Sequence, residues 1–524
     1  MLKLKSTSYR WAITHLSNQS DTDLFPRPFE IDALACYPEE VVRVLQTTDT
    51  KSWSAGRSTI VPKGELSFRF ATQLDPWDSL ILTAAIREFG DGIEQKRIPY
   101  SDEIVFSYRF EPMSDGKMYK MDADWPSFWG KSKEKAAHIG GYVAIADVSS
   151  YYNQIYHHSL ENQLQKAGVP SEVAESIIRL CAHLTQGVSR GIPVGPHATH
   201  LLAECVFDPI DRNLLAAGYT FCRFVDDIHI FCKTRQQAQI AFYDLAEILD
   251  KQQKLSLQSH KSKILSADDF IEYAERAIAE APPPSLKLER EIIEVIDRYS
   301  NGDPYRRIDA AVLSEEDKAI LSQHNLEEVL NSYLDQGEPN FVRICWLFRR
   351  LAQVGVPGAI PLAVAKLEQF SPAIADLASY LLSAQYGYPL SEWKHVGEAI
   401  LHALELPIIR HSEYLTVILL DLFARLPLLN HLESILQKYR TSGSYMVNRK
   451  IIRVATAHHA DYWLHQRKEE FPGADPWLKR ALIAGASTFS KDERKYWLQR
   501  IEKEGTELEK FIAKWAKTEK LEKL

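Results

Sequence analysis

The sequence lacks several features that would assign it to a broad class of proteins. Its six cysteines, spread over 524 residues, have no CxxC spacing, and most stand in apolar runs. This distribution favours buried thiols over disulfides or a zinc site. No stretch approaches the roughly 20 uninterrupted apolar residues that a membrane span needs, and the first residues lack the apolar core of a signal peptide. We therefore expect a cytoplasmic protein with no membrane partner.

An excess of positive charge is also missing. The formal net charge is −8, which argues against a protein that coats nucleic acid through bulk charge. Any nucleic-acid contact is then expected to be local, in a basic channel on an acidic body. Hydrophobic residues make up 45% and charged residues 25%, as is usual in soluble globular proteins. The length leaves room for two or three domains.

The character of the sequence changes in its second half. Up to about residue 270, helix and strand signals alternate, and the clearest strand is the apolar run from Tyr142 to Val148. Residues 281–285, Ala-Pro-Pro-Pro-Ser, form a stiff breaker and predict a linker. Amphipathic helices with Pro and Gly breaks follow, which favours either an irregular α-solenoid or a helical bundle. The expected division is an N-terminal segment 1–40, an α/β domain 41–270 and an all-α domain 271–524.

Two adjacent carboxylates, Asp226 and Asp227, stand between two apolar runs. The β-branched and aromatic residues from Thr220 to Cys232 predict a β-hairpin with the acidic pair at its tip. Neighbouring carboxylates among strand-forming residues are costly unless a cation lies on them. Their hard oxygen atoms suit Mg²⁺.

A third carboxylate, Asp147, closes the strand that contains Ala144–Ala146. Taken alone, Asp147 is best explained as the N-cap of the helix that follows. Together with Asp226 and Asp227 it gives three carboxylates at strand ends, a set that can hold two Mg²⁺ ions. One ion would lower the pKa of an attacking hydroxyl and the other would clamp a triphosphate. We predict that these three residues are catalytic and bind metal.

Four motifs occur in the order found in reverse transcriptases, and the resemblance covers about residues 40–266. In that family they are palm motif A, the loop before the motif B helix, the metal-binding motif C and a segment that ends in a lysine beside the nucleotide. The motifs in this chain are Asp147–Ile155, Gly191–Pro196, Phe224–Asp227 and Leu255–Ser262. The resemblance implies a palm and fingers, with Asp147 and Asp226 as the main metal ligands. It also gives Asp227 as the third acidic group and a backbone carbonyl from Val148.

The same resemblance implies a nucleotide site. Tyr152 matches the aromatic residue that closes off the sugar 2′ position, so the expected substrates are dNTPs. Tyr151 and Tyr152 are adjacent at a helix start, so only one should face the site while the other packs in the core, and we choose Tyr152. Arg109 lies on a strand-like segment where the fingers supply cations for a triphosphate. Lys261 ends the last motif. The alternative for both cations is a solvated surface residue.

One departure from the family matters for the choice of template. Val194 stands where a glutamine near the templating base pair is usual, and an apolar side chain cannot make the same polar contacts. With a helical half behind it, the domain resembles the abortive-infection (Abi) polymerases of bacterial phage defence. That resemblance implies template-independent DNA synthesis, a tyrosine of the protein as primer, single-stranded DNA left covalently attached, and a homo-oligomer.

We select Tyr9 among 23 tyrosines as the priming residue, because it follows small hydroxyl residues and precedes Arg10. The alternative is a tyrosine packed on the body of the protein beside Trp11. Two other functions stay open at this point. One is an RNA-templated reverse transcriptase of the retron or intron type, and the other is a catalytically idle protein that senses phage.

Overall fold

The computed structural model describes residues 3–22, 24–47, 53–54, 56–278, 287–300, 307–335, 339–439 and 443–518. It forms two compact units. The first contains Met1–Ser58 and Ala71–Pro282, and the second contains Thr59–Phe70 and Pro283–Leu524. The linker predicted at 281–285 lies outside the described residues. The three-part division of the chain with boundaries at 40 and 270 stays a prediction.

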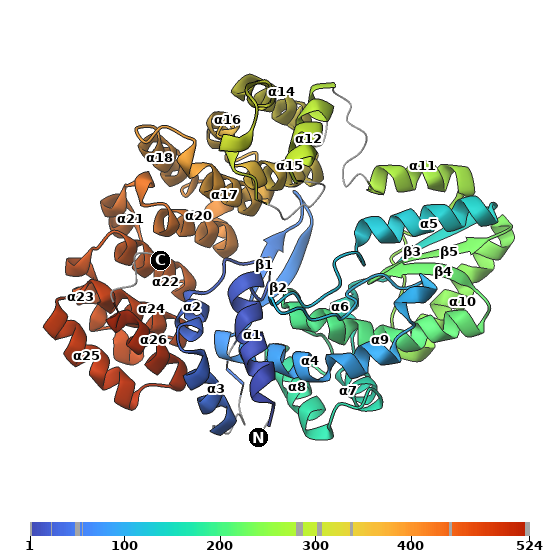
Figure 1. Cartoon of the computed structure of the whole chain (residues 1–524), viewed down its shortest axis with the longest axis horizontal. Helices are drawn as coiled ribbons and strands as arrows, with labels where there is room; N and C mark the ends of the chain where they lie inside the picture. Colours follow the sequence, from blue (N-terminus) through green and yellow to red (C-terminus); the bar gives the residue numbers. More distant parts are fainter. Residues whose placement is uncertain are drawn as a thin grey trace. The chain divides into compact units, whose positions relative to one another are not determined.

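The first unit contains a four-stranded antiparallel sheet with the order β4-β5-β3-β6, which lies between α5 (Trp125–Ile139) and α10 (Arg235–Gln253) (Figure 1). Its strands are β3 (Tyr142–Asp147), β4 (Thr220–Phe224), β5 (Asp227–Cys232) and β6 (Lys263–Ser266). Strands β4 and β5 pair as the predicted hairpin. The register of β3 against β5 runs from Tyr142 opposite Cys232 to Asp147 opposite Asp227. Two of the three predicted carboxylates are therefore direct neighbours at one end of the sheet.

Helices cover both faces of this sheet. Helices α5 (Trp125–Ile139) and α11 (Ala267–Ile278) pack on one face, and α10 (Arg235–Gln253) packs on the other, where it also contacts α9 (His197–Ala216) (Figure 1). Val143 and Ile145 of β3 join the apolar core beneath α5 and α11. Because side chains alternate along a strand, Ala144 and Ala146 point to the opposite face. Burial on both faces explains the continuous apolar run in the sequence.

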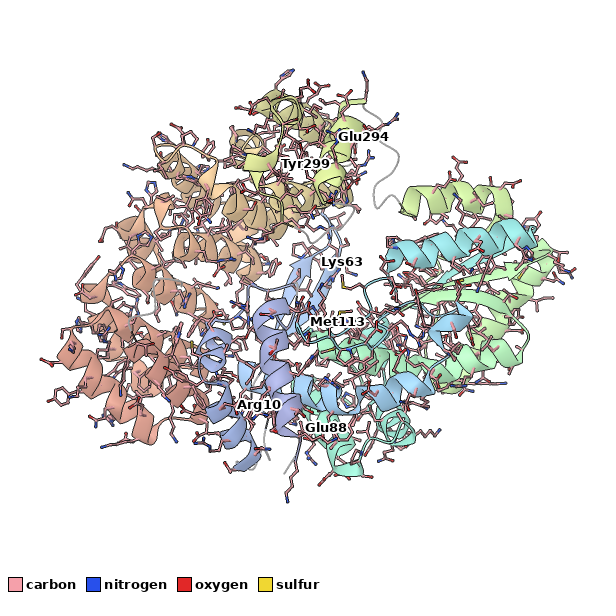
Figure 2. All side chains as sticks on the ribbon, in the orientation of Figure 1. Arg10, Lys63, Glu88, Met113, Glu294 and Tyr299 are labelled. Atoms are coloured by element: carbon pink, nitrogen blue, oxygen red, sulfur yellow. The ribbon has the colours of Figure 1, made fainter. Side chains whose placement is uncertain are left out.

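The first unit contains further helices, of which α4 contacts both α1 and α9. They are α1 (Ser6–Gln19), α2 (Phe29–Ala35), α3 (Pro38–Thr47), α4 (Pro76–Lys96), α6 (Tyr151–Gln154), α7 (His157–Lys166) and α8 (Ser171–Leu184). Strands β1 (Arg57–Pro62) and β2 (Phe68–Gln73) form a separate two-stranded sheet. Polar contacts fix α1. Arg10 pairs with Glu39 at 2.7 Å, and the Trp11 indole N–H donates to the Met113 carbonyl over 2.6 Å (Figure 2).

Beyond residue 286, the part of the chain that the structure describes contains helices and no β-strand. The α-helices are α12 (Lys287–Ser300), α13 (Glu315–Ile320), α14 (Gln323–Leu334), α15 (Phe341–Val354), α16 (Ile360–Ala365), α17 (Ile374–Ser383), α18 (Trp393–Ala403), α19 (Pro407–His411), α20 (Glu413–Arg425), α21 (Leu432–Lys438), α22 (Tyr445–Ala457), α23 (Asp461–Lys468), α24 (Pro476–Gly485), α25 (Lys491–Glu504) and α26 (Glu507–Lys517). Helices α15, α17, α20, α22, α24 and α26 pack in that order, each on the next. Such a row has the stacking of a solenoid rather than of a bundle around one axis. The predicted succession of an α/β part and an all-α part is confirmed.

None of the helices that the structure describes combines the length and the apolarity that a membrane span requires.

One buried histidine of the sheet gives a prediction about pH. The centroid of the His229 ring on β5 lies 4.5 Å from that of Phe128 and 4.4 Å from that of Trp129. Its Nδ1 lies 2.9 Å from the Ser132 hydroxyl. Burial, assisted by the charge of Lys263, lowers the pKa of His229 from 6.5 to about 3. Below pH 6.5 the unfolded chain binds a proton that the folded protein excludes. The contribution of neutral His229 to the free energy of unfolding is therefore fully present above pH 6.5, and it is lost as the pH drops toward 3.

Replacing His229 by Phe should flatten this pH dependence. Between pH 7 and pH 5 the free energy of unfolding of the wild type should fall more steeply, by up to about 1.4 kcal/mol per pH unit. Urea unfolding followed by tryptophan fluorescence measures the slope. His138 is exposed and serves as the control, so His138→Ala should keep the wild-type slope. Equal slopes for wild type and His229→Phe would contradict the assignment.

Candidate active site

The three predicted carboxylates lie at one end of the sheet. Asp147 is the last residue of β3, Asp227 is the first of β5, and Asp226 lies in the two-residue turn before it. Burial, together with the negative charges of Asp226 and Asp147, raises the pKa of Asp227 from 3.8 to about 7, whereas Lys261 opposes the shift. Because Asp147 faces Asp227 across the sheet and Asp226 precedes Asp227 in the chain, the three carboxylates share one end of the sheet. Negative charge gathered in this way favours a nearby cation.

Lys261 and Val148 belong to the same cluster. The Lys261 ammonium lies 2.8 Å from Asp147 Oδ2. Burial lowers the pKa of Lys261, but the hydrogen bond to Asp147 and the nearby carboxylate charges outweigh it and raise the pKa. The N–H of Val148 donates to the Asp226 carbonyl over 3.1 Å, and the N–H of Gln258 donates to the Asp147 carbonyl over 2.8 Å. Backbone contacts thus bring together three of the predicted motifs.

The donor chemistry of this cluster fits a divalent cation. Among the residues that the structure describes, no group of three or more His, Cys, Asp or Glu side chains already converges as a metal site. The carboxylates nonetheless offer hard oxygen atoms, and a divalent ion would relieve the repulsion that raises the pKa of Asp227. Asp147, Asp226 and the carbonyl of Val148 are the groups that would hold it.

A strained backbone carries Asp226. Val225, the residue before it, has a φ of 54°, a value that a β-branched residue rarely adopts and that costs about 1–3 kcal/mol. Both of its peptide groups are held by side chains. Its N–H donates to the Ser107 hydroxyl over 2.9 Å, and its carbonyl accepts from Arg223 Nη1 over 2.8 Å. These two contacts fix the turn that presents the acidic pair.

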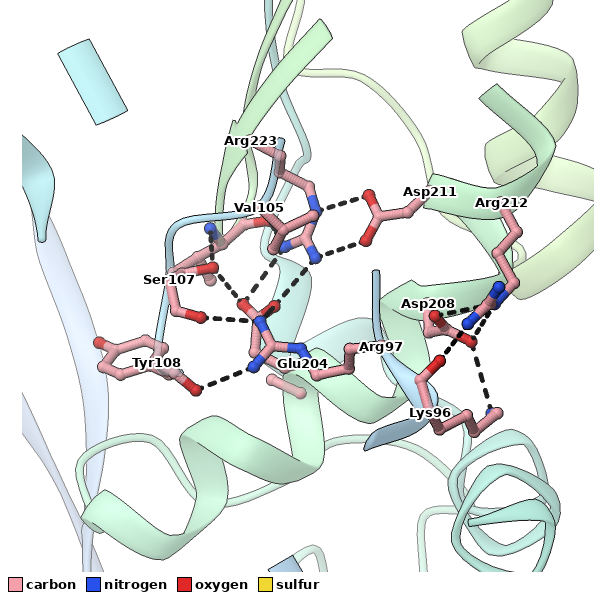
Figure 3. A network of polar contacts seen from close by, with 12 residues as sticks. Lys96, Arg97, Val105, Ser107, Tyr108, Glu204, Asp208, Asp211, Arg212 and Arg223 are labelled. Carbon is pink, nitrogen blue, oxygen red and sulfur yellow. Dashed lines mark hydrogen bonds and ion pairs between the residues drawn. The ribbon is translucent and has the colours of Figure 1, made fainter. Parts of the chain in front are cut away.

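A buried ion network fixes Ser107 and Arg223 in turn (Figure 3). Glu204 of α9 is fully buried and accepts from the Ser107 hydroxyl at 2.6 Å, from Arg97 Nη2 at 2.6 Å and from Arg223 Nη2 at 2.9 Å. Arg223 also forms a two-point pair with Asp211, at 2.7 and 2.6 Å. Burial raises the pKa of Glu204, but the Arg223 and Arg97 guanidiniums outweigh it and hold the pKa below the usual value. Glu204 is therefore ionised and joins the two arginines.

Sequence reasoning did not find this network, although a signal was present. Glu204 and Asp211 stand seven residues apart in an apolar helix, which puts them on one face two turns apart. Arg223 stands inside an apolar strand. Charged residues of opposite sign in otherwise apolar elements indicate a buried pair, because an unpaired buried charge is too costly. What the sequence alone did not show is that these elements are neighbours.

The nucleotide-site residues that we predicted have different surroundings. The Tyr151 ring is buried and its hydroxyl donates to the Ala203 carbonyl over 2.6 Å, whereas Tyr152 is partly exposed and its hydroxyl lies 2.7 Å from His200 Nδ1. Arg109 is buried and paired with Glu94 of α4. Burial, followed by the charge of Arg97, lowers the pKa of Arg109 to about 10. The Arg109 guanidinium is thus directed to Glu94.

Tyr9 lies in a different part of the first unit from the carboxylates. Its side chain is 1% exposed within α1, the helix that packs against α2, α3 and α4. Burial and the charge of Glu88 raise the pKa of Tyr9 to about 12. The structure therefore gathers Asp147, Val148, Asp226, Asp227 and Lys261 at the sheet end, and it leaves Tyr9 in the N-terminal helix packing.

The segment that carries these carboxylates matches a known protein family. Residues 104–287 match the family model described as reverse transcriptase (RNA-dependent DNA polymerase). No curated protein matches the chain. Among solved structures, the chain is similar to telomerase from Candida albicans, solved with a fragment of telomeric RNA. The TM-score is 0.31 with 10% identity, over 75% of this chain and 67% of that one.

The matched segment contains all three carboxylates, Lys261 and Tyr152, and every member of the Glu204 network except Arg97. The chain therefore carries a polymerase domain of the reverse-transcriptase type. The predicted fold class, a palm and fingers like those of reverse transcriptases followed by an α-helical domain, is confirmed.

Neutralising Glu204 should destabilise the first unit strongly. In Glu204→Gln, two buried guanidiniums share one carboxylate, and we expect a loss of about 3–5 kcal/mol in the free energy of unfolding. Ser107→Ala removes one neutral donor and should cost about 1 kcal/mol. Urea unfolding measures both values.

The control is Glu175→Gln, which removes the exposed partner of Arg179 and should change the stability little. A loss for Glu204→Gln no larger than that of the control would show that the network does not hold the fold.

Proposed function

We propose that this protein is a Mg²⁺-dependent DNA polymerase of the reverse-transcriptase type that joins dNTPs. The supporting observation is the set of three carboxylates, Asp147, Asp226 and Asp227, at one end of a sheet inside the matched segment. Asp147, Asp226 and the Val148 carbonyl would hold two Mg²⁺ ions. When bound, the ions would lower the pKa of the primer's attacking hydroxyl and stabilise the charge of the leaving pyrophosphate.

The proposal also gives roles to the other predicted residues of the site. Lys261 neutralises Asp147 in the metal-free protein and can turn to a phosphate when a cation takes its place. The Tyr152 ring closes the space where a ribose 2′-hydroxyl would lie, so that dNTPs are the substrates. Arg109 reaches a triphosphate only if its pair with Glu94 opens. The family match alone does not assign these roles.

The contacts of the motif B loop support synthesis without a template. The Val194 carbonyl accepts from the Thr72 N–H over 2.8 Å, and the His197 N–H donates to the Asp21 carbonyl over 2.8 Å. A Cβ added at Gly195 would lie 3.1 Å from the Thr22 hydroxyl oxygen, so the loop fits closely against the N-terminal segment. The loop that would touch a templating base is thus held from two sides and presents an apolar side chain.

A protein primer, covalent DNA, a homo-oligomer, a cytoplasmic location and a role in abortive phage defence belong to the same proposal. They rest on the resemblance to Abi polymerases. Tyr9 is our candidate primer, and its burial means that α1 must move before its hydroxyl can reach the carboxylates. Peptide mapping of the DNA-bearing tyrosine by mass spectrometry identifies the primer, and DNA on any other tyrosine removes Tyr9 from the proposal.

The direct experiment supplies the purified protein with labelled dNTPs and Mg²⁺ and with no nucleic acid. We expect labelled DNA that stays with the protein after denaturation. Asp226→Asn should reduce incorporation to background, because a main metal ligand is lost. Asp250→Asn, in an exposed pair with Lys254, should incorporate like the wild type. Strict dependence on an RNA template would favour the templated alternative, and no incorporation under either condition would favour the idle sensor.

Thermal unfolding offers a second prediction that needs no turnover. The ionised form of Asp227 destabilises the folded, metal-free protein, because folding raises its pKa from 3.8 to about 7. This cost is absent below pH 3.8 and is fully present above pH 7. In EDTA, Asp227→Asn should therefore raise the melting temperature more at pH 8 than at pH 5.

Added Mg²⁺ should stabilise the wild type, by about 2.7 kcal/mol at 100 times its Kd. The gain should shrink in Asp226→Asn and persist in Asp250→Asn. An equal Mg²⁺ gain in all three proteins would show that the ion binds elsewhere.

A further inference from the structure

A cluster of aromatic rings fixes the surroundings of Tyr152. The Tyr152 hydroxyl lies 2.7 Å from His200 Nδ1, and the two rings meet edge to face with centroids 5.9 Å apart. One face of the His200 ring stacks on Tyr108, with centroids 4.0 Å apart and an angle of 6° between the planes. His200, on the helix that follows the motif B loop, therefore contacts the Tyr152 hydroxyl through a ring nitrogen and Tyr108 through a ring face.

The Tyr108 ring is itself held by the backbone beneath it. Tyr108 has a φ of 45°, which an aromatic residue adopts only under constraint. Its carbonyl accepts from Arg97 Nη1 over 2.9 Å, and the preceding carbonyl, of Ser107, accepts from Arg97 Nη2 over 2.8 Å (Figure 3). Arg97 in turn pairs with Glu204. The support of His200 thus extends back to the buried ion network.

The same cluster reaches the acidic turn. The Tyr108 ring lies 6.2 Å from that of Phe224, the last residue of β4 before the turn that carries Asp226. The rings therefore connect the residue proposed to face the sugar with the strand that presents a proposed metal ligand. A side chain in this position can fix the distance between the two.

We propose that His200 is a positioning residue that fixes the Tyr152 ring and so sets the preference for dNTPs over rNTPs. This inference rests on the proposed polymerase function. The Tyr152 side chain can turn about two torsions, and a phenol without a partner would sample positions that leave room for a 2′-hydroxyl. The hydrogen bond to His200 favours one position. Its loss should reduce the discrimination about 5- to 10-fold.

The test compares kcat/KM for dATP and ATP in the full-length protein. The variants are His200→Ala, Tyr152→Phe, the double variant and His200→Asn, whose side-chain amide can take the place of Nδ1. His200→Ala and Tyr152→Phe should each lower the dATP/ATP ratio 5- to 10-fold, mainly through faster use of ATP. The double variant should lose no more than one single variant, because both remove the same contact. His200→Asn should recover most of the wild-type ratio.

Exposed His138→Ala is the control and should keep the wild-type ratio. The inference is overturned if His200→Ala keeps that ratio, or if the two single losses multiply in the double variant. It is also overturned if His200→Asn discriminates no better than His200→Ala. Tyr152→Phe leaves His200 in place, so it tests the hydrogen bond even where His200→Ala does not fold. A wild type that incorporates neither nucleotide refutes the proposed function, and this inference falls with it.

Discussion

The site depends on one buried carboxylate, Glu204, held between two guanidiniums. Arg97 directly follows α4 as its C-cap, Arg223 lies in β4 and Glu204 lies in α9, so the ion contacts join three parts of the chain that are distant in sequence. A buried charge without partners would cost several kcal/mol, which leaves these elements few other arrangements. Asp211 supplies the second negative charge for Arg223, so that two cations face two anions. The first unit obtains its local geometry from this balance.

The ion network holds two residues with a strained backbone. Val225 and Tyr108 both have positive φ, at 54° and 45°, and each would cost about 1–3 kcal/mol without support. Arg223 and Ser107 hold Val225, and Arg97 holds Tyr108. One residue precedes the acidic pair and the other carries the ring beneath His200. The network therefore supports the proposed metal site and the proposed sugar site at once.

Sequence reasoning found the parts of the site that local patterns determine. The hairpin at Asp226 was predicted from the β-branched and aromatic residues on both sides of the acidic pair, and the strand that ends at Asp147 from its continuous apolar run. The sheet confirms both. The side-chain surroundings of Arg109 were not foreseen, because pairing with Glu94 is set by packing against α4. The contacts of His200 and Glu204 were not predicted for the same reason, since their partners lie far away in the sequence. The choice between a solenoid and a bundle likewise depended on which helices stack.

The most direct measurement is a crystal structure of the protein with Mn²⁺ and a non-hydrolysable dNTP analogue. Mn²⁺ prefers the same oxygen ligands as Mg²⁺ and can be located by its anomalous scattering. The account predicts anomalous peaks against Asp147 and Asp226, with Lys261 turned from Asp147 to a phosphate. An intact sheet with no peak at these carboxylates at saturating Mn²⁺, and with Lys261 still on Asp147, would contradict it.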